Sequence, residues 1–192
     1  MAWYDLSSEK ETRRQYLQRV KYEEIICKRT KNFVDVIGDD LRPNVQYRLV
    51  TELAFNALIV IEYLLKKYEI TEMYIAVYRM NLDSVNRLKQ VIDSGQIRCS
   101  ILLSSFFREN KKYERWAEEL VQYAQNKNHV QVAFSVNHAK VFLAKTKCQR
   151  YIVFEGSGNL SDNARIEQYL IEDNETTFEF HKGWIIETIT GP

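Results

Sequence analysis

The sequence predicts an α/β domain with a central mixed β-sheet flanked by helices. Two observations predict this fold class. Helical and strand patterns alternate as far as about residue 125, and four short strand patterns follow with little between them. The chain has 192 residues, of which 45% are hydrophobic and 28% charged, as is typical of one sizeable globular domain.

The N-terminal segment carries a helix signal. Ser8 and Glu11 form a capping box, and a charged helical run continues from it to about Thr30. Turn-forming residues follow. We therefore expect residues 1–42 to form an N-terminal helical extension and residues 43–192 to form the main domain.

The remaining elements follow from hydrophobic spacing, cap residues and β-rich runs. The expected helices cover residues 44–68, 81–95, 110–125 and 176–189. The expected strands cover residues 73–77, 97–103, 129–134, 138–144, 151–154 and 167–171. A strand remains an alternative for the last helix, because its segment contains Thr, Phe and Ile.

Charge, cysteine and hydropathy patterns limit where the protein works. The formal net charge is +1, so affinity for a polyanion has to come from a local patch. Cys27, Cys99 and Cys148 have neither disulfide nor metal-ligand spacing, which suits a reducing compartment. The sequence starts without a signal-peptide pattern, and its longest apolar stretch, residues 53–65, is too short to span a bilayer. We expect a cytoplasmic protein without a membrane partner.

Two short motifs in the second half carry chemistry. His138 and Lys140 lie two residues apart on an expected strand, so their side chains project to the same face. A glycine-rich turn over residues 156–161 follows the next strand and offers a hydroxyl, a carboxamide and backbone N–H groups. Together they place a nucleophile beside an anion-binding turn, which is what attack on a phosphodiester requires.

The motifs His138-Ala139-Lys140 and Gly156-Ser157-Gly158-Asn159 together resemble the signature of the phospholipase D superfamily, in its single-motif, endonuclease-like branch. The resemblance extends from about residue 52 to residue 184. It implies a phospholipase D-like domain whose catalytic residues are His138, Lys140, Ser157, Asn159 and Glu167.

The resemblance also implies a role for each of these residues. His138 attacks phosphorus and forms a phosphohistidine, which water later resolves. Lys140 neutralises a nonbridging phosphoryl oxygen, and Ser157 and Asn159 donate hydrogen bonds to the same oxygens. Glu167 is expected to accept a hydrogen bond from the far nitrogen of a histidine and to fix its tautomer.

One copy of the signature supplies one imidazole, whereas the reaction needs one group to attack and another to protonate the leaving oxygen. An isologous homodimer would place two copies of His138 across one pocket, so we expect the protein to pair with itself. The chemistry requires no metal or other cofactor, because lysines and amides do the work of a cation. The only other histidines, His129 and His181, have no partner at metal-ligand spacing.

Basic residues suggest where a substrate binds. Lys145, Lys147 and Arg150 lie on the loop between the two motif halves, and with Gly156 and Gly158 they are the expected substrate-binding residues. A second cluster interleaves basic and aromatic side chains, a combination that can stack bases and follow phosphates. Its members are Arg108, Lys111, Lys112, Arg115, Phe106, Phe107, Tyr113 and Trp116. An ordinary helix with one solvated and one buried face is the alternative for this cluster.

Taken together, the sequence predicts a metal-independent phosphodiesterase, with a DNA endonuclease as the first hypothesis. The second hypothesis is a nucleic-acid-binding module that has lost turnover, because Lys145 stands where the superfamily usually has an aspartate. The third is a phospholipase, which would need an apolar groove for acyl chains beside the site. An enzyme and a binding module differ in whether bound DNA is cut.

Overall fold

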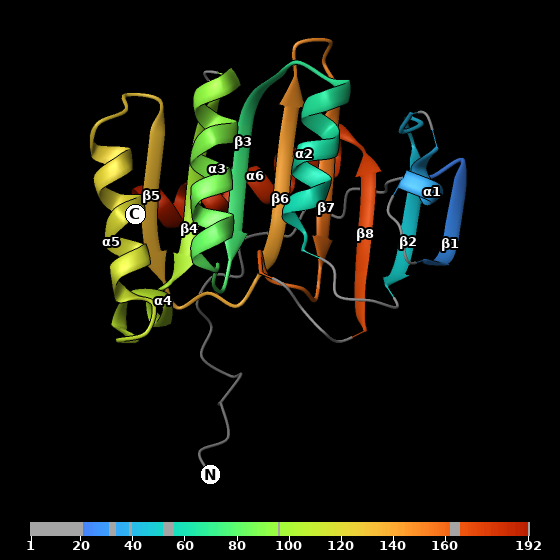
Figure 1. The fold of residues 1–192 in the computed structure, drawn as a ribbon. Helices are drawn as coiled ribbons and strands as arrows, with labels where there is room; N and C mark the ends of the chain where they lie inside the picture. The colour runs from blue at the N-terminus through green and yellow to red at the C-terminus, as the bar shows by residue number, and fades with distance from the viewer. Residues whose placement is uncertain are drawn as a thin grey trace, which may run out of the picture.

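An eight-stranded sheet runs through the middle of the computed structural model, which describes residues 21–30, 34–38, 40–51, 56–95, 97–161 and 166–191 (Figure 1). The strand order is β1-β2-β8-β7-β6-β3-β4-β5. The strands are β1 (Glu24–Thr30), β2 (Val45–Thr51), β3 (Ile70–Val77), β4 (Arg98–Ser104), β5 (Val130–Ser135), β6 (Lys140–Thr146), β7 (Tyr151–Gly156) and β8 (Glu167–Asp173). The helices are α1 (Val34–Ile37), α2 (Leu58–Lys67), α3 (Leu82–Gly95), α4 (Ser105–Glu109), α5 (Glu114–Gln125) and α6 (Glu175–Thr190). The predicted α/β class with a mixed sheet is therefore confirmed.

The strand directions place the carboxyl ends of some strands and the amino ends of others at one edge of the sheet. Strands β3, β4 and β5 are parallel, and β6 is antiparallel to both β3 and β7. Strand β8 is antiparallel to both β7 and β2. The carboxyl ends of β2, β3, β4, β5 and β7 therefore meet the amino ends of β6 and β8 at the lower edge in Figure 1.

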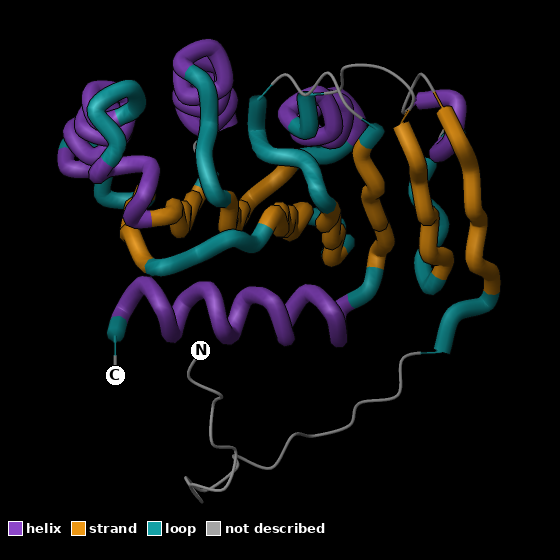
Figure 2. Tube along the Cα trace, turned by 90° about the horizontal axis from the view of Figure 1, so that it is seen from below, coloured by secondary structure: helices purple, strands orange, loops and turns teal. Residues whose placement is uncertain are grey.

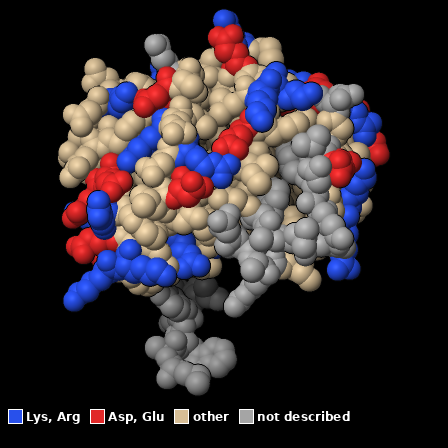
Figure 3. All heavy atoms as spheres, viewed as in Figure 1, with Lys and Arg blue, Asp and Glu red and all other residues tan. Residues whose placement is uncertain are grey.

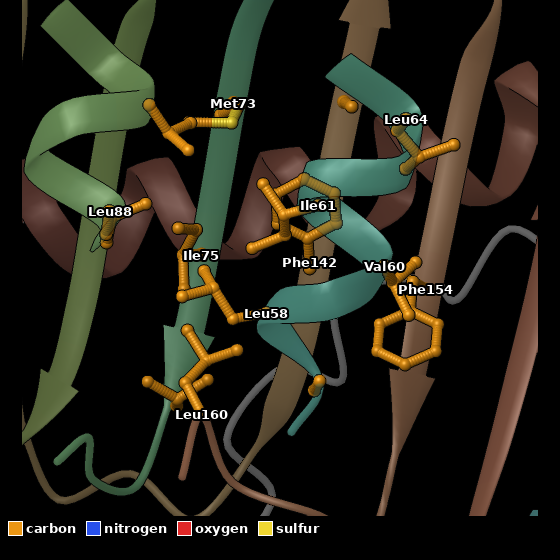
Figure 4. Close-up of a cluster of buried hydrophobic side chains, with 14 of the residues drawn as sticks. Leu58, Val60, Ile61, Leu64, Met73, Ile75, Leu88, Phe142, Phe154 and Leu160 are labelled. Atoms are coloured by element: carbon orange, nitrogen blue, oxygen red, sulfur yellow. The ribbon is translucent and has the colours of Figure 1, made fainter. Parts of the chain in front are cut away.

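Helices cover both faces of the sheet. Helices α2, α3 and α5 lie against one face, and α6 lies against the other, as Figure 2 shows from below. On the first face, side chains of α2 such as Leu58 and Ile61 pack on Ile75 and Phe142, with Leu160 below them (Figure 4). On the second face, Phe178 of α6 is fully buried among strand residues. No described helix combines the length and the apolar character that crossing a membrane requires.

Two expected helical segments are wrong. Within residues 44–68, the structure has strand β2 followed by α2 instead of one helix. Residues 24–30, expected to end the N-terminal helix, form β1, which pairs in parallel with β2. This part of the expected helical extension thus belongs to the sheet, where charged side chains suit an edge strand. The expected helix over residues 1–20 falls outside the described residues.

The other expected elements are present with small shifts. The helix expected over residues 110–125 begins at Glu114 and is preceded by the short α4. Ser104 caps α4, because its hydroxyl oxygen accepts a hydrogen bond from the backbone N–H of Phe106. The segment over residues 176–189 is helical in α6, where the side chain of Asn174 caps the first turn by accepting from the N–H of Thr177.

Candidate active site

The segment before β6 is fastened to the ends of two other strands. The side-chain Nδ2 of Asn137 donates to the carbonyl oxygens of Val77 and Leu102, each at 3.3 Å. Its Oδ1 accepts a hydrogen bond from the backbone N–H of Ala139 at 2.8 Å. These bonds tie the residue that precedes His138 to β3 and β4, so the backbone that carries His138 is held at the lower edge of the sheet.

His138 and Lys140 are in direct contact. The Nζ of Lys140 lies 2.9 Å from Nδ1 of His138 and 2.7 Å from the carbonyl oxygen of the same residue. The imidazole packs on the ring of Tyr78, with 4.6 Å between ring centroids, and Nζ lies 5.7 Å from the centroid of that ring. His138 is exposed and Lys140 half-buried. A substrate can therefore reach the imidazole, while the ammonium is fixed beside it.

The charge state of Lys140 is set by two opposing effects. Burial lowers the pKa of the Lys140 ammonium below its usual value, because the charged form loses hydration. The negative charge of Glu167 acts in the opposite direction and raises that pKa. Glu167 thus helps to keep Lys140 protonated, which is the state that can bind a phosphate.

Gly156 allows two strands to meet closely at the site. It pairs with Tyr169 of β8 at the end of β7. A Cβ at this position would collide with the carbonyl oxygen of Gln168 and with the ring of Tyr169, and it would lie 3.1 Å from the Cα of Tyr169. Glycine is therefore required here by close approach of the neighbouring strand.

The hydroxyl of Ser157 is held between β7 and β8. Its Oγ donates to the Oε2 of Glu167 and accepts from the backbone N–H of Gln168 at 3.0 Å. The carboxylate of Glu167 thus contacts Ser157 within the chain. Strand β7 lies between β6 and β8 and separates their ends by about 10 Å, so the expected bond from Glu167 to a histidine stays a prediction.

The rest of the glycine-rich turn is anchored through Leu160. This side chain is 3% exposed, and its backbone forms a bridge with Met80, just beyond β3. Its carbonyl oxygen also accepts from the N–H of Asn81 at 3.3 Å. Gly158 is buried and Asn159 half-buried. The turn is therefore held at the same edge of the sheet as Tyr78 and His138.

The three basic residues of the intervening loop lie elsewhere. Strand β6 is about 20 Å long, and the β6–β7 hairpin is at its far end, at the top in Figure 1. Lys147 pairs there with Glu69 at 2.9 Å, and Arg150 pairs with Asp173 and Asp40. Lys145 lies over the ring of Tyr151, 5.2 Å from its centroid. The structure does not bring these residues to His138, because the hairpin joins the opposite ends of the two motif strands.

The fold is similar to that of several solved structures. NucT from Helicobacter pylori matches with a TM-score of 0.53 and 20% identity, over 74% of this chain and 94% of NucT. Nuc from Salmonella typhimurium, a phospholipase D family member, matches with a TM-score of 0.53 and 12% identity, over 73% of this chain and 93% of Nuc. The chain has a phospholipase D fold. Polyphosphate kinase from Porphyromonas gingivalis also matches, with a TM-score of 0.55 and 13% identity, over 76% of this chain but 26% of the kinase. No protein-family model and no curated protein matches the sequence.

On this phospholipase D fold, two residues at the site were missed from the sequence. Asn137 holds the backbone of the first motif, and Tyr78 supports both His138 and Lys140. Asn137 directly precedes the motif, and Tyr78 directly follows β3, at the edge where strand ends meet. A rule that inspects the residues just beyond each predicted strand would have found both.

A cavity of about 960 Å³ adjoins the site of the phospholipase D fold. It is lined on one side by Ala139, Lys140 and Gly156, and it extends over β8, β2 and β1. Within the described ranges, no three His, Cys, Asp or Glu side chains come together as metal ligands would. The groups that the structure places at this edge are an imidazole, an ammonium, a carboxylate and a glycine-rich turn.

Proposed function

We propose that the protein is a metal-independent phosphodiesterase that cleaves DNA through a phosphohistidine on His138, in a site formed by two copies of the chain. The contact between Lys140 and His138, next to the glycine-rich turn, carries the proposal. An exposed imidazole held against an ammonium combines a nucleophile with a binding group for a phosphoryl oxygen. The similarity to Nuc, a phospholipase D family member, supports this chemistry.

The reaction takes two steps in which atoms and protons balance. A nitrogen of His138 attacks phosphorus, so that a P–N bond forms and the bond to the leaving oxygen breaks. The protonated His138 of the second copy gives its proton to that oxygen. The same imidazole, now neutral, takes a proton from water, whose oxygen attacks phosphorus and breaks the P–N bond. Both histidines are then restored.

Lys140 connects substrate binding to release of the nucleophile. Two of its three N–H groups face Nδ1 and the carbonyl oxygen of His138, which leaves the third for a phosphoryl oxygen. A phosphate is a stronger acceptor than a neutral imidazole, because a charged acceptor forms the stronger hydrogen bond. An arriving phosphodiester therefore draws the ammonium away from Nδ1 and frees the imidazole to attack.

A nucleic-acid-binding module without turnover is the second candidate. One observation favours it, since the Ser157 hydroxyl donates to Glu167 and neither group contacts His138. In that case Lys140 and the turn still bind a phosphate, but His138 lacks a carboxylate partner among the described residues of its own chain.

Cleavage of labelled single- and double-stranded DNA in EDTA tests the proposal. We compare the unchanged protein with His138→Ala and with His181→Ala, whose histidine lies on α6 and contacts Glu155. Cleavage in EDTA that is lost only in His138→Ala supports the proposal. Activity that EDTA abolishes contradicts it. Absent cleavage, with DNA binding that weakens in Lys140→Ala, supports the binding module.

Size in solution tests the two-copy site separately. The expected result is a dimer at micromolar concentration, and a strict monomer that cleaves DNA excludes the two-histidine mechanism. Mixing the unchanged protein with an excess of His138→Ala adds a second readout. A mixed dimer holds one intact His138 in its shared pocket and is expected to be inactive, so activity per unchanged chain falls, whereas chains that act alone keep their activity in the mixture.

A further inference from the structure

An aromatic stack extends from His138 to the protein surface. The ring of Tyr78 contacts the imidazole of His138, with centroids 4.6 Å apart. On Tyr78 lies Phe106, at 5.2 Å and with 12° between the ring planes, a stacked geometry. Phe106 is 38% exposed.

The fold does not need Phe106 for its own packing. The neighbouring Phe107 is fully buried and attaches α4 to the core, where it stacks with Tyr113 at 5.9 Å between centroids. Ser104 fixes the start of the same short helix. Phe106 is therefore an exposed aromatic side chain on an element that is already anchored, and its ring points to the edge that carries His138.

Positive charge surrounds this stack. The exposed side chains Arg108, Lys111 and Lys112 follow Phe106 in sequence, and Arg79 follows Tyr78. Within the described part of the chain, none of these four cations forms an ion pair, and Arg79 donates instead to the hydroxyl of Tyr113 at 3.0 Å. Figure 3 shows Lys and Arg side chains gathered at the lower left edge, below α5. Such cations attract a phosphate backbone.

We infer that Tyr78 and Phe106 form a nucleobase-stacking platform, and that the substrate is single-stranded nucleic acid. The inference rests on the proposed function for the identity of the scissile phosphate. A base can lie on Phe106 while Arg79, Arg108 and Lys112 contact the phosphates beside it, and the strand then continues past Tyr78 to His138. Bases in a duplex already stack on both sides, so only an unpaired base offers a free face to Phe106.

Binding to strands with and without bases tests the platform. The two probes are an oligothymidylate and a strand of the same length in which every nucleotide is a tetrahydrofuran abasic unit. Both carry the same phosphates, and both are measured in a His138→Asn background so that neither is cut. We expect the oligothymidylate to bind more tightly, because only it can stack.

The variants separate stacking from charge. Phe106→Ala is expected to weaken oligothymidylate binding by at least about 5-fold, the lower end for loss of one stacked base, and to leave the abasic strand unchanged. Phe180→Ala is the matched control, because Phe180 is 66% exposed on α6, on the other face. Phe106→Trp is expected to restore binding, whereas Phe106→Leu, which keeps an apolar side chain without an aromatic face, is not.

The outcomes distinguish this inference from the proposed function. Equal weakening of both strands by Phe106→Ala, or no effect on either, overturns the platform. Preference for the oligothymidylate that depends on Phe106, in a protein that cuts no DNA, leaves the platform standing and contradicts the proposed function. Cleavage in EDTA that depends on His138, combined with no effect of Phe106→Ala on binding of either strand, supports the proposed function and overturns the platform.

Discussion

The Nζ of Lys140 contacts both the imidazole and the backbone of His138, at 2.9 Å from Nδ1 and 2.7 Å from the carbonyl oxygen. One side chain thus orients the ring of the candidate nucleophile and also carries the positive charge that a phosphodiester needs. Loss of Lys140 removes both effects at once. Loss of another lysine on the same strand removes neither.

Lys140→Ala is expected to lower kcat for DNA cleavage by about 100-fold or more, the usual cost of losing one group that stabilises a transition state. Lys145→Ala is the matched control on β6, because Lys145 lies at the other end of the strand over Tyr151. Steady-state kinetics on a labelled single strand measures both variants. Equal losses in the two variants contradict this assignment of the site.

The pH dependence of cleavage reports the charge on Lys140. Burial lowers the pKa of Lys140, so its ammonium is lost at a lower pH than that of an exposed lysine, and activity falls on the alkaline side below the usual lysine range. Glu167→Gln removes a negative charge that raises this pKa, while its amide oxygen can still accept from Ser157. The alkaline limb of kcat/KM is therefore expected to move to lower pH.

Glu155→Gln is the control for this shift, because Glu155 lies on the adjacent β7 and pairs with His181. Its alkaline limb is expected to coincide with that of the unchanged protein. If the alkaline limb of the Glu167→Gln variant stays in place or moves to higher pH, a group other than Lys140 controls the loss of activity at alkaline pH.

The local sequence pattern predicts an element correctly where the residues of that element alone determine its conformation. Strand β6 follows from its short apolar run, and α3 follows from its apolar spacing between Asn81 and Gly95. The pattern misled at β2, because leucines four residues apart, such as Leu49 and Leu53, fit a helix, whereas the alternation of buried and exposed residues that marks the strand is short. Pairing with β1 and β8 decides in favour of the strand.

Distant contacts decide the arrangement of the candidate site. Asn137 bonds to carbonyl groups 60 and 35 residues away in the chain, so no local pattern reveals its role. Arg150 lies close in sequence to the glycine-rich turn, yet the direction of β7 carries it to the opposite edge. Sequence proximity to a motif therefore does not imply proximity to the site when an antiparallel hairpin intervenes.

Arg150 is expected to stabilise the fold and to leave cleavage unaffected. Its guanidinium is 18% exposed and bonds to the buried Asp173 and to the carbonyl oxygen of Leu41. Arg150→Ala leaves the Asp173 carboxylate without this partner, and we expect the free energy of unfolding to fall by about 3 kcal/mol or more. Urea denaturation measures this loss, and kcat per folded molecule is expected to stay unchanged.

Lys147→Ala is the comparison from the same hairpin. Lys147 and Glu69 are both 68% exposed, so breaking this pair is expected to change the free energy of unfolding by about 1 kcal/mol at most. If Arg150→Ala instead unfolds like the unchanged protein and loses DNA cleavage, Arg150 binds substrate, as the sequence first indicated.

Alanine substitutions at two glycines test whether the glycine-rich turn depends on the close approach of β7 and β8. A Cβ at Gly156 would collide with the carbonyl oxygen of Gln168 and the ring of Tyr169, so Gly156→Ala has to separate β7 from β8. Gly183 lies in α6 with nothing within 4 Å of an added Cβ, so Gly183→Ala is expected to stabilise the protein by about 0.5–1 kcal/mol. Thermal unfolding of both variants measures the contrast. Ser157 follows Gly156 directly and bonds to Gln168. The strand separation in Gly156→Ala is therefore expected to displace the Ser157 hydroxyl and to lower kcat. The kcat of Gly183→Ala is expected to stay unchanged.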